Sequence, residues 1–433
     1  MQPVHASGNA GHLSNPLVRA IRWATGSPAR AFLLVFSLAF VVRLWSVSLI
    51  QDDLIAPNSQ WENGAVAISL AESGRFADPY IIPTGPTAHV IPLYVGTTGL
   101  LYRVLGIGYG AGLVRWILIA AAYSVLWGLL PWVGQRLGLG REAGFVGGLA
   151  GALVIGFPAE IEPLSALTLL LLMMAFLSRW FGKWGTPARS LVLGVAVGVA
   201  FHLQPALLPV VLGFLAFEMW RNRLRQGAGL LALVFGMAIA CVPWGVRNYR
   251  TFDALFFIRS NFGLELYVGN HDNAHADIDV SSARGSFRHP RTDVEEAERV
   301  LELGEARYMR EKQREAVQWI REHPGAFLQL TATRIAYFWA GPLHRLSRAF
   351  GYLVLLGVAL VGAWYALPSL TGPARAALFI PLLTYPLVYY VVAYMPRYGE
   401  PVRWILFLLA GAAVWRWLAG SHALRGPTPY SGR

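Results

Sequence analysis

Long blocks of apolar residues alternate with short polar connections along most of the 433-residue chain. About 20 apolar residues cross a bilayer as a helix, so several blocks need their flanks to reach across. The period-two alternation of membrane β-strands does not occur. The pattern predicts an all-α polytopic membrane protein, a bundle of about 10–12 transmembrane helices with helices in its extracytoplasmic loops. The blocks that form all or part of a span cover residues 33–50, 144–156, 164–177, 191–201, 207–217, 230–242, 352–366, 376–393 and 404–415.

The composition agrees with a membrane protein. Hydrophobic residues make up 55% of the chain and charged residues 14%, whereas a soluble protein carries roughly a quarter. The net charge of +12 comes mainly from arginines between the apolar blocks, where cytoplasmic loops carry them. We therefore expect no nucleic-acid partner. The single cysteine, Cys241, excludes a disulfide within the chain.

The arginines also predict an orientation. Three of them, Arg19, Arg22 and Arg30, precede the first block and place the N-terminus in the cytoplasm. The following short loops agree with this rule as far as the seventh span. The prediction is a cytoplasmic tail (1–30), an N-terminal transmembrane module (31–246) with a first extracytoplasmic loop (51–110), a large extracytoplasmic loop (247–323) and a C-terminal transmembrane module (324–433).

The topology after the large loop has two solutions. If residues 327–340 span the membrane, Arg397 and Glu400 lie inside and the C-terminus outside. If that segment lies along the interface, both assignments reverse. Within the large loop, spacing predicts one amphipathic helix over 294–320. Its acids mostly alternate with arginines, which is typical of a solvated helix face.

The acidic residues are unevenly distributed. The large loop holds 14 of the 24, and five of the other ten lie in the first loop. A carboxylate at the membrane edge is expensive unless it has a function, so these are functional candidates. Glu62 begins a predicted amphipathic helix, where the helix dipole alone would also stabilise it. The five acids of the first loop are Asp52, Asp53, Glu62, Glu72 and Asp78.

Three motifs carry a family resemblance. The first runs from Gln60-Trp61-Glu62-Asn63-Gly64 to Thr84-Gly85-Pro86-Thr87-Ala88, the second is Pro243-Trp244-Gly245-Val246-Arg247-Asn248 continuing to Asn270, and the third is Arg397-Tyr398-Gly399-Glu400-Pro401. They resemble the C-type integral membrane glycosyltransferases, which include the protein O-mannosyltransferases and aminoarabinose transferases. Ser59-Gln60 stand where many relatives have an Asp-Glu pair, which leaves Glu62 as the main acid.

The resemblance implies a donor and a mechanism. It predicts transfer of a hexose or pentose from a polyprenyl-phosphate donor to a glycan, lipid or protein acceptor, with inversion at the anomeric carbon. The enzyme would be a multi-pass protein of a bacterial inner membrane with its active site on the extracytoplasmic side. Glu62 would be the general base and Asp53 its partner.

The remaining site candidates follow from the chemistry of a phosphate leaving group. Arginine forks suit phosphate oxygens, although they also pair with lipid headgroups or loop acids. A divalent metal is one further expectation, with Asp53, Glu62 and His89 as its only candidate ligands. Glu162, an acid in a short turn between two spans, could point into the cavity or cap a helix. The predicted substrate-binding residues are His89, Tyr94, Arg247, Asn248, Arg259, Glu265, Asn270, Arg397 and Tyr398.

Two other functions fit parts of the sequence. A transporter or flippase for lipid-linked sugars would need polar residues in the middle of its spans, and here the acids lie at the outer edge. An O-antigen-type polymerase or ligase would centre on arginines of one large loop and would not need the first loop.

Overall fold

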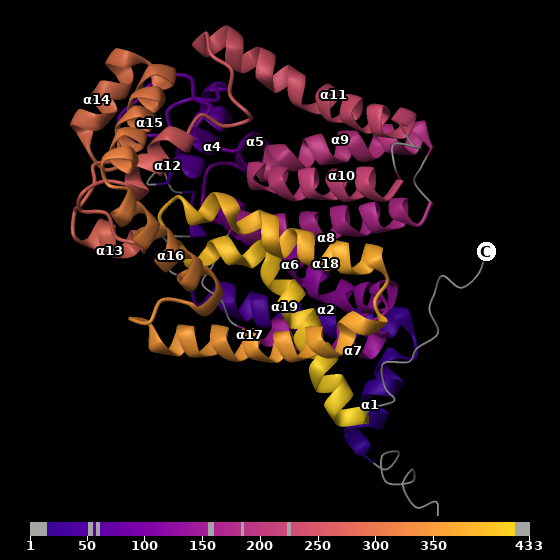
Figure 1. Ribbon diagram of the computed structural model, residues 1–433. Coiled ribbons are helices and arrows are strands. Elements are labelled where there is room, and N and C mark those ends of the chain that lie inside the picture. Colours follow the sequence, from indigo (N-terminus) through magenta and orange to yellow (C-terminus); the bar gives the residue numbers. More distant parts are fainter. Residues whose placement is uncertain are drawn as a thin grey trace, which may run out of the picture.

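The computed structural model describes residues 15–50, 55–57, 61–154, 160–182, 186–222 and 227–420 (Figure 1). Within these ranges the fold is helical, and the β-structure consists of two isolated bridges, Ala77–Pro86 and Asp277–Tyr394. Asp52 and Asp53 lie outside the described residues. The α-helices are α1 (Pro16–Thr25), α2 (Pro28–Ser48), α4 (Glu62–Ser73), α5 (Pro92–Leu105), α6 (Tyr109–Leu137), α7 (Arg141–Leu153), α8 (Ile161–Trp180), α9 (Pro187–Leu203), α10 (Leu208–Asn222), α11 (Gly227–Phe252), α12 (Phe262–Gly269), α13 (Ile278–Ala283), α14 (Val294–Leu303), α15 (Glu305–Glu322), α16 (Pro324–Ala340), α17 (Leu346–Ala366), α18 (Gly372–Thr384) and α19 (Glu400–Ala419). Short 3-10 turns are η2 (Pro205–Leu207), η3 (Leu367–Ser369), η4 (Tyr385–Tyr390) and η5 (Pro396–Gly399).

Six helices of the described residues are long and apolar enough to cross a membrane: α2, α6, α8, α11, α17 extended by η3, and α19 preceded by η5. Exposed apolar side chains such as Leu231 and Phe235 on α11 and Trp364 on α17 suit a lipid-facing surface. The prediction of an all-α polytopic membrane protein is confirmed. The number of about 10–12 spans stays a prediction, because α7, α9, α10, α16 and α18 are shorter.

Glycines let several of these helices pack at close range. A Cβ on Gly147 of α7 would lie 2.4 Å from the Phe407 carbonyl oxygen of α19, and one on Gly194 of α9 would lie 2.0 Å from the Leu233 oxygen of α11. Membrane helices gain stability mainly from such close packing, because lipid supplies no hydrophobic driving force between them. Substituting either glycine with a larger residue would push its helix pair apart.

The helices of the first loop and the large loop gather at one end of the bundle. α4, α5 and α12–α15 lie together at the left of Figure 1, whereas α1 lies at the other end, among the ends of α7 and α19. We call the first the loop end and the second the far end. The first loop and the large loop, which are far apart in the sequence, thus form one layer.

The predicted helix over 294–320 is wrong as a single element. It divides at Gly304, whose φ of 75° is a left-handed conformation that glycine adopts without strain. The two parts, α14 and α15, pack against each other. This turn lets the Tyr308 hydroxyl donate a hydrogen bond to Glu296 Oε2 at 2.6 Å.

Both ends of α16 lie at the loop end. Just before it, Trp319 Nε1 donates to Asp272 of the large loop at 2.7 Å. Just after it, Arg345 Nη2 lies 2.7 Å from Asp279 Oδ2 of the same loop. Of the two solutions that the sequence left open, the geometry favours the one in which residues 327–340 do not cross.

Candidate functional site at the loop end

Glu62 lies in the first turn of α4, as predicted, and its carboxylate faces the large loop. Its Oε1 is 3.7 Å from Arg291 Nε and 3.9 Å from His289 Nε2, and the side chain is 19% exposed. The Arg291 guanidinium also covers the Trp61 ring at 4.4 Å from its centroid. Glu62 therefore does not point into open solvent, and its contacts to Arg291 and His289 are long enough to be exchanged for contacts with a ligand.

Arg259 lies within electrostatic range of this carboxylate. Its Nε donates to the His89 carbonyl oxygen at 2.7 Å, which fixes the guanidinium against the first loop. Arg259 interacts electrostatically with Glu265, Tyr398 and Glu62. Burial lowers the pKa of Arg259, and the nearby acids oppose that shift. Its terminal nitrogens make no hydrogen bond to a described residue, so they are available to an anion.

Arg397 approaches the same place from η5. Its Nε is 3.3 Å from Glu162 Oε1 at the start of α8, and its side chain is 48% exposed. Arg397 also interacts electrostatically with Tyr398, Glu265 and Glu62. This ion pair places the Arg397 turn at the same end as the Glu160–Pro163 turn.

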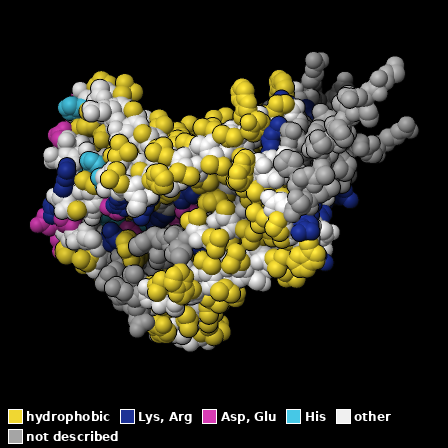
Figure 2. All heavy atoms as spheres, turned by 90° about the horizontal axis from the view of Figure 1, so that it is seen from below, with side chains coloured by type: hydrophobic (Ala, Val, Ile, Leu, Met, Phe, Trp, Pro, Cys, Tyr) yellow, Lys and Arg dark blue, Asp and Glu magenta, His cyan; other side chains and the backbone are white. Residues whose placement is uncertain are grey.

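Together these residues form what we call the loop-end site: Glu62, Glu162, Arg259, Glu265, Arg397 and Tyr398. Four separate segments of the chain supply it: α4, the start of α8, the stretch from 259 to α12, and η5. The Tyr398 ring stacks on Tyr389 with centroids 4.3 Å apart. Figure 2 shows basic and acidic side chains gathered at one end of the surface and inside a recess between apolar areas.

Arg247 lies nearby but is engaged by the backbone. Its Nη1 donates to the Thr87 carbonyl oxygen at 2.7 Å and its Nη2 to the Phe76 oxygen at 3.3 Å. The guanidinium also covers the Trp244 ring at 4.9 Å. Asn248 is fully buried and accepts a hydrogen bond from Arg247 at 3.0 Å. The Pro-Trp-x-x-Arg-Asn motif thus anchors the first loop to α11.

Glu305 completes this anchor, and sequence reasoning missed it. Its buried carboxylate accepts hydrogen bonds from Thr87 Oγ1 at 2.5 Å, the Ala88 backbone N–H at 2.8 Å and Ser260 Oγ at 2.7 Å. Burial raises the pKa of Glu305, and the hydrogen bonds from Thr87 and Ser260 oppose the shift. Because Ser260 follows Arg259, the Glu305 carboxylate helps to hold Arg259 in position.

Three further predicted residues are buried in polar contacts. The His89 ring bonds through Nδ1 to the Tyr80 hydroxyl at 3.0 Å, and burial followed by the charge of Arg259 lowers its pKa, so the ring is neutral at neutral pH. The Tyr94 hydroxyl donates to Glu160 Oε2 at 2.7 Å. Asn270 donates to two backbone oxygens and accepts from Arg334. These three side chains support the loops around the site.

A metal centre is not built from the described residues. They contain no group of three or more His, Cys, Asp and Glu side chains placed to hold a metal ion. The candidate Asp53 lies outside the described residues, so the set of Asp53, Glu62 and His89 stays a prediction.

His289 and Arg291 were also missed, and the reason is distance along the chain. Both belong to the polar stretch before α14, more than 220 residues after Glu62. Neither has a local sequence signal that separates it from its charged neighbours. Glu162, by contrast, could be identified as an acid isolated between two apolar blocks.

No protein-family model and no curated protein matches this chain.

Proposed function

We propose that this chain is an integral membrane glycosyltransferase that moves a sugar from a polyprenyl-phosphate donor to an extracytoplasmic acceptor. The observation that carries the proposal is the loop-end site, in which carboxylates and arginines from four segments meet beside an apolar bundle. The motif resemblance to C-type glycosyltransferases supports it independently, because most of the site residues lie in the three matching motifs.

The reaction needs a base and a holder for the leaving group. Glu62 takes the proton of the acceptor hydroxyl or amine while the acceptor atom bonds to the anomeric carbon. The bond from that carbon to the phosphate oxygen breaks, and polyprenyl phosphate leaves. A positioned general base contributes typically about 10²–10⁴-fold in rate.

Arg259 and Arg397 hold the phosphate in this proposal. Among the residues that the structure describes, none bonds the terminal nitrogens of Arg259, and Arg397 pairs with Glu162 alone and has a half-exposed side chain. Charge that is positioned before the reaction often contributes the largest catalytic term. The exposed apolar helices would accommodate the lipid chain.

The position of the charges favours an enzyme over a transporter. Glu62, Glu162 and Glu265 all lie at the loop end, at or beyond the ends of the apolar helices. A transporter would place its binding groups near the membrane midplane.

The test is transfer from defined polyprenyl-phosphate sugars by purified Glu62→Gln. We expect turnover to fall by about 10²–10⁴-fold while the protein stays folded. Glu72→Gln is the matched control, because Glu72 lies exposed at the other end of α4 and should leave turnover unchanged. Near-normal turnover of folded Glu62→Gln would remove Glu62 from the base role.

A further inference from the structure

The residue before Arg259 has a backbone conformation that its own side chain disfavours. Ile258 has a φ of 63°. Left-handed backbone is uncommon for residues other than glycine, and for a β-branched side chain it is a genuine outlier. The other two non-glycine residues with positive φ in the described part of the chain are Asp78 and Asp253, and aspartate tolerates this region better. The conformation of Ile258 must therefore be imposed by its surroundings.

A hydrogen bond closes a tight turn around Ile258. The Arg259 backbone N–H donates to the Phe257 carbonyl oxygen at 2.7 Å. A three-residue turn of this kind with a positive central φ is the rare and strained form of the γ-turn. Such conformations persist only where the surrounding structure holds them, and they cluster at functional sites. This turn immediately precedes the arginine that holds the phosphate in the proposed function.

Two side chains of α11 hold the turn. The Ile258 carbonyl oxygen accepts hydrogen bonds from Trp244 Nε1 at 2.8 Å and from Asn248 Nδ2 at 3.5 Å. These two residues are four apart on α11 and therefore lie on the same face of the helix. The Ile258 side chain is 3% exposed and belongs to the hydrophobic core of the bundle. The Pro-Trp-x-x-Arg-Asn motif thus fixes the Ile258 peptide group as well as the first loop.

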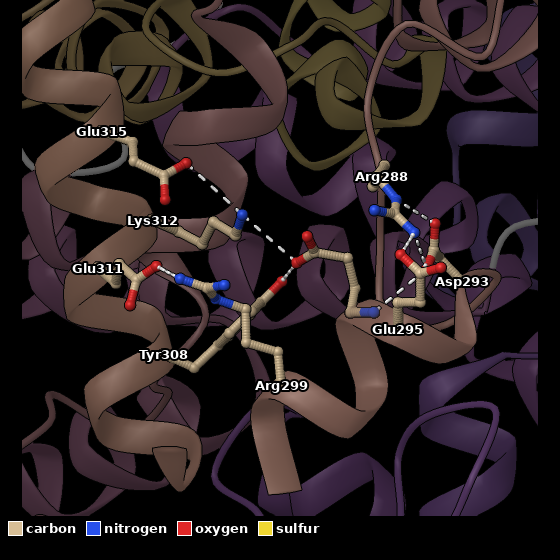
Figure 3. A network of polar contacts seen from close by, with 9 residues as sticks. Arg288, Asp293, Glu295, Arg299, Tyr308, Glu311, Lys312 and Glu315 are labelled. Carbon is tan, nitrogen blue, oxygen red and sulfur yellow. Dashed lines mark hydrogen bonds and ion pairs between the residues drawn. The ribbon is translucent and has the colours of Figure 1, made fainter. Parts of the chain in front are cut away.

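The chain after Arg259 is also held. Ser260 Oγ donates to the Glu305 carboxylate at 2.7 Å. Glu305 begins α15, and Figure 3 shows that α15 is tied to α14 by the ion pair of Glu311 with Arg299. Because both neighbours of Arg259 are anchored, its backbone has one orientation, and its side chain is directed to the first loop.

We propose that Ile258 is a positioning residue, whose strained turn, held by Trp244 and Asn248, aims the Arg259 guanidinium at the donor phosphate. The inference rests on the proposed function for the role of Arg259. Rotation of Ile258 to an ordinary negative φ would open the turn and carry Arg259 away from the His89 carbonyl oxygen that its Nε contacts.

A role in packing alone predicts the opposite response to substitution of Ile258. Truncation of a buried isoleucine leaves a cavity, and glycine leaves a larger cavity and a more flexible unfolded chain than alanine does. Glycine is therefore the worse replacement where only packing matters. Where a positive φ matters, glycine is the better replacement, because it adopts that conformation without strain.

The first measurement needs no substrate. We expect purified I258G to unfold at a higher temperature than I258A. The matched control is Val300, a β-branched residue of α14 that is 2% exposed, where V300A should unfold at a higher temperature than V300G. A lower unfolding temperature for I258G than for I258A would overturn the proposal, because the strain that it requires would be absent.

The second measurement is the donor KM for transfer from a defined polyprenyl-phosphate sugar. W244F removes the indole N–H and keeps an aromatic ring. In the W244F background, I258G should have a donor KM about tenfold lower than I258A, the factor for weakening one charge-assisted hydrogen bond to the phosphate. In the R259Q background the two KM values should be equal while the unfolding temperatures still differ, because the effect on the donor acts through Arg259.

Two kinetic results would overturn the positioning role even with the expected order of stability. One is an equal donor KM for I258A and I258G in the W244F background, and the other is a KM difference that survives R259Q. Absence of transfer by the unaltered chain would overturn the proposed function itself and the role of Arg259 with it, and it is seen before any variant is made.

Discussion

Helix α8 carries an arginine–glutamate pair at each end; both glutamates are buried, but the two arginines are held differently. At the far end, Arg179 and Glu218 have side chains that are 0% and 4% exposed. Arg179 Nε and Nη2 both contact Glu218 at 2.8–3.0 Å, and Arg179 also bonds Ser190. At the loop end, about 26 Å away along the helix, Glu162 has one contact of 3.3 Å to a half-exposed Arg397.

The difference separates charges that hold the fold from charges that can be used. A buried pair is held by geometry, and removing either partner leaves an uncompensated charge. A half-exposed arginine with one contact loses little when its partner changes, because water can replace it. The same pair of residue types is therefore expected to govern stability at the far end of α8 and activity at the loop end.

The largest expected effect is at the far end. Glu218→Gln should lower the free energy of unfolding by about 3–5 kcal/mol, because it removes the buried carboxylate that Arg179 contacts. Glu162→Gln should lower it by about 1 kcal/mol or less, since Arg397 can be hydrated. Chemical unfolding of both variants in detergent measures the difference. Equal losses at the two ends would show that the comparison is wrong.

A comparable effect on the reaction is expected at the loop end. If Arg397 holds the leaving phosphate, Arg397→Gln should reduce kcat by about 10²–10³-fold with little change in stability. Arg375→Gln is the control, because Arg375 is an exposed arginine on α18 outside the site. A fall in stability that accounts for the lost activity would instead make Arg397 a structural residue.

A smaller effect is expected on the pH dependence of the free energy of unfolding, and it arises at the loop end, where His289 lies. Burial lowers the pKa of His289 from 6.5 to about 4, so the folded state holds this ring neutral. The unfolded chain takes up the proton first, so the contribution of His289 is full above pH 6.5 and is lost as the pH falls towards 4. Between pH 7 and pH 5 this amounts to roughly 2 kcal/mol.

The measurement is the free energy of unfolding of His289→Gln across the same pH range. Its slope should be shallower than that of the wild type by the His289 contribution. Parallel curves for wild type and His289→Gln would mean that the ring is protonated in both states or in neither.

Much of the fold could be predicted because helix formation in a membrane is a local property. A sufficiently long apolar block must satisfy its backbone groups within itself, so the blocks around α2, α8 and α11 became helices as predicted. The amphipathic helix α4 was predicted from its periodicity, and it begins at Glu62 as the sequence indicated. The single helix over 294–320 failed because the periodicity continues across Gly304, and only the φ of that residue divides it.

Only part of the candidate site could be predicted, again because the sequence carries local information. Glu62 and Arg397 belong to motifs that can be recognised, whereas Glu305 and His289 lie among many similar charges. The sequence also did not separate Arg247, whose terminal nitrogens bond the backbone, from Arg259, whose terminal nitrogens bond none of the described residues. That difference depends on carbonyl oxygens more than 150 residues away.

By itself, the sequence determined the all-helical membrane class and the helix that begins at Glu62, because apolar length and periodicity act over a few turns of chain. Only the tertiary structure decided which arginines are engaged and that both ends of α16 lie at the loop end. These outcomes depend on contacts between segments that the chain brings together only when it is folded.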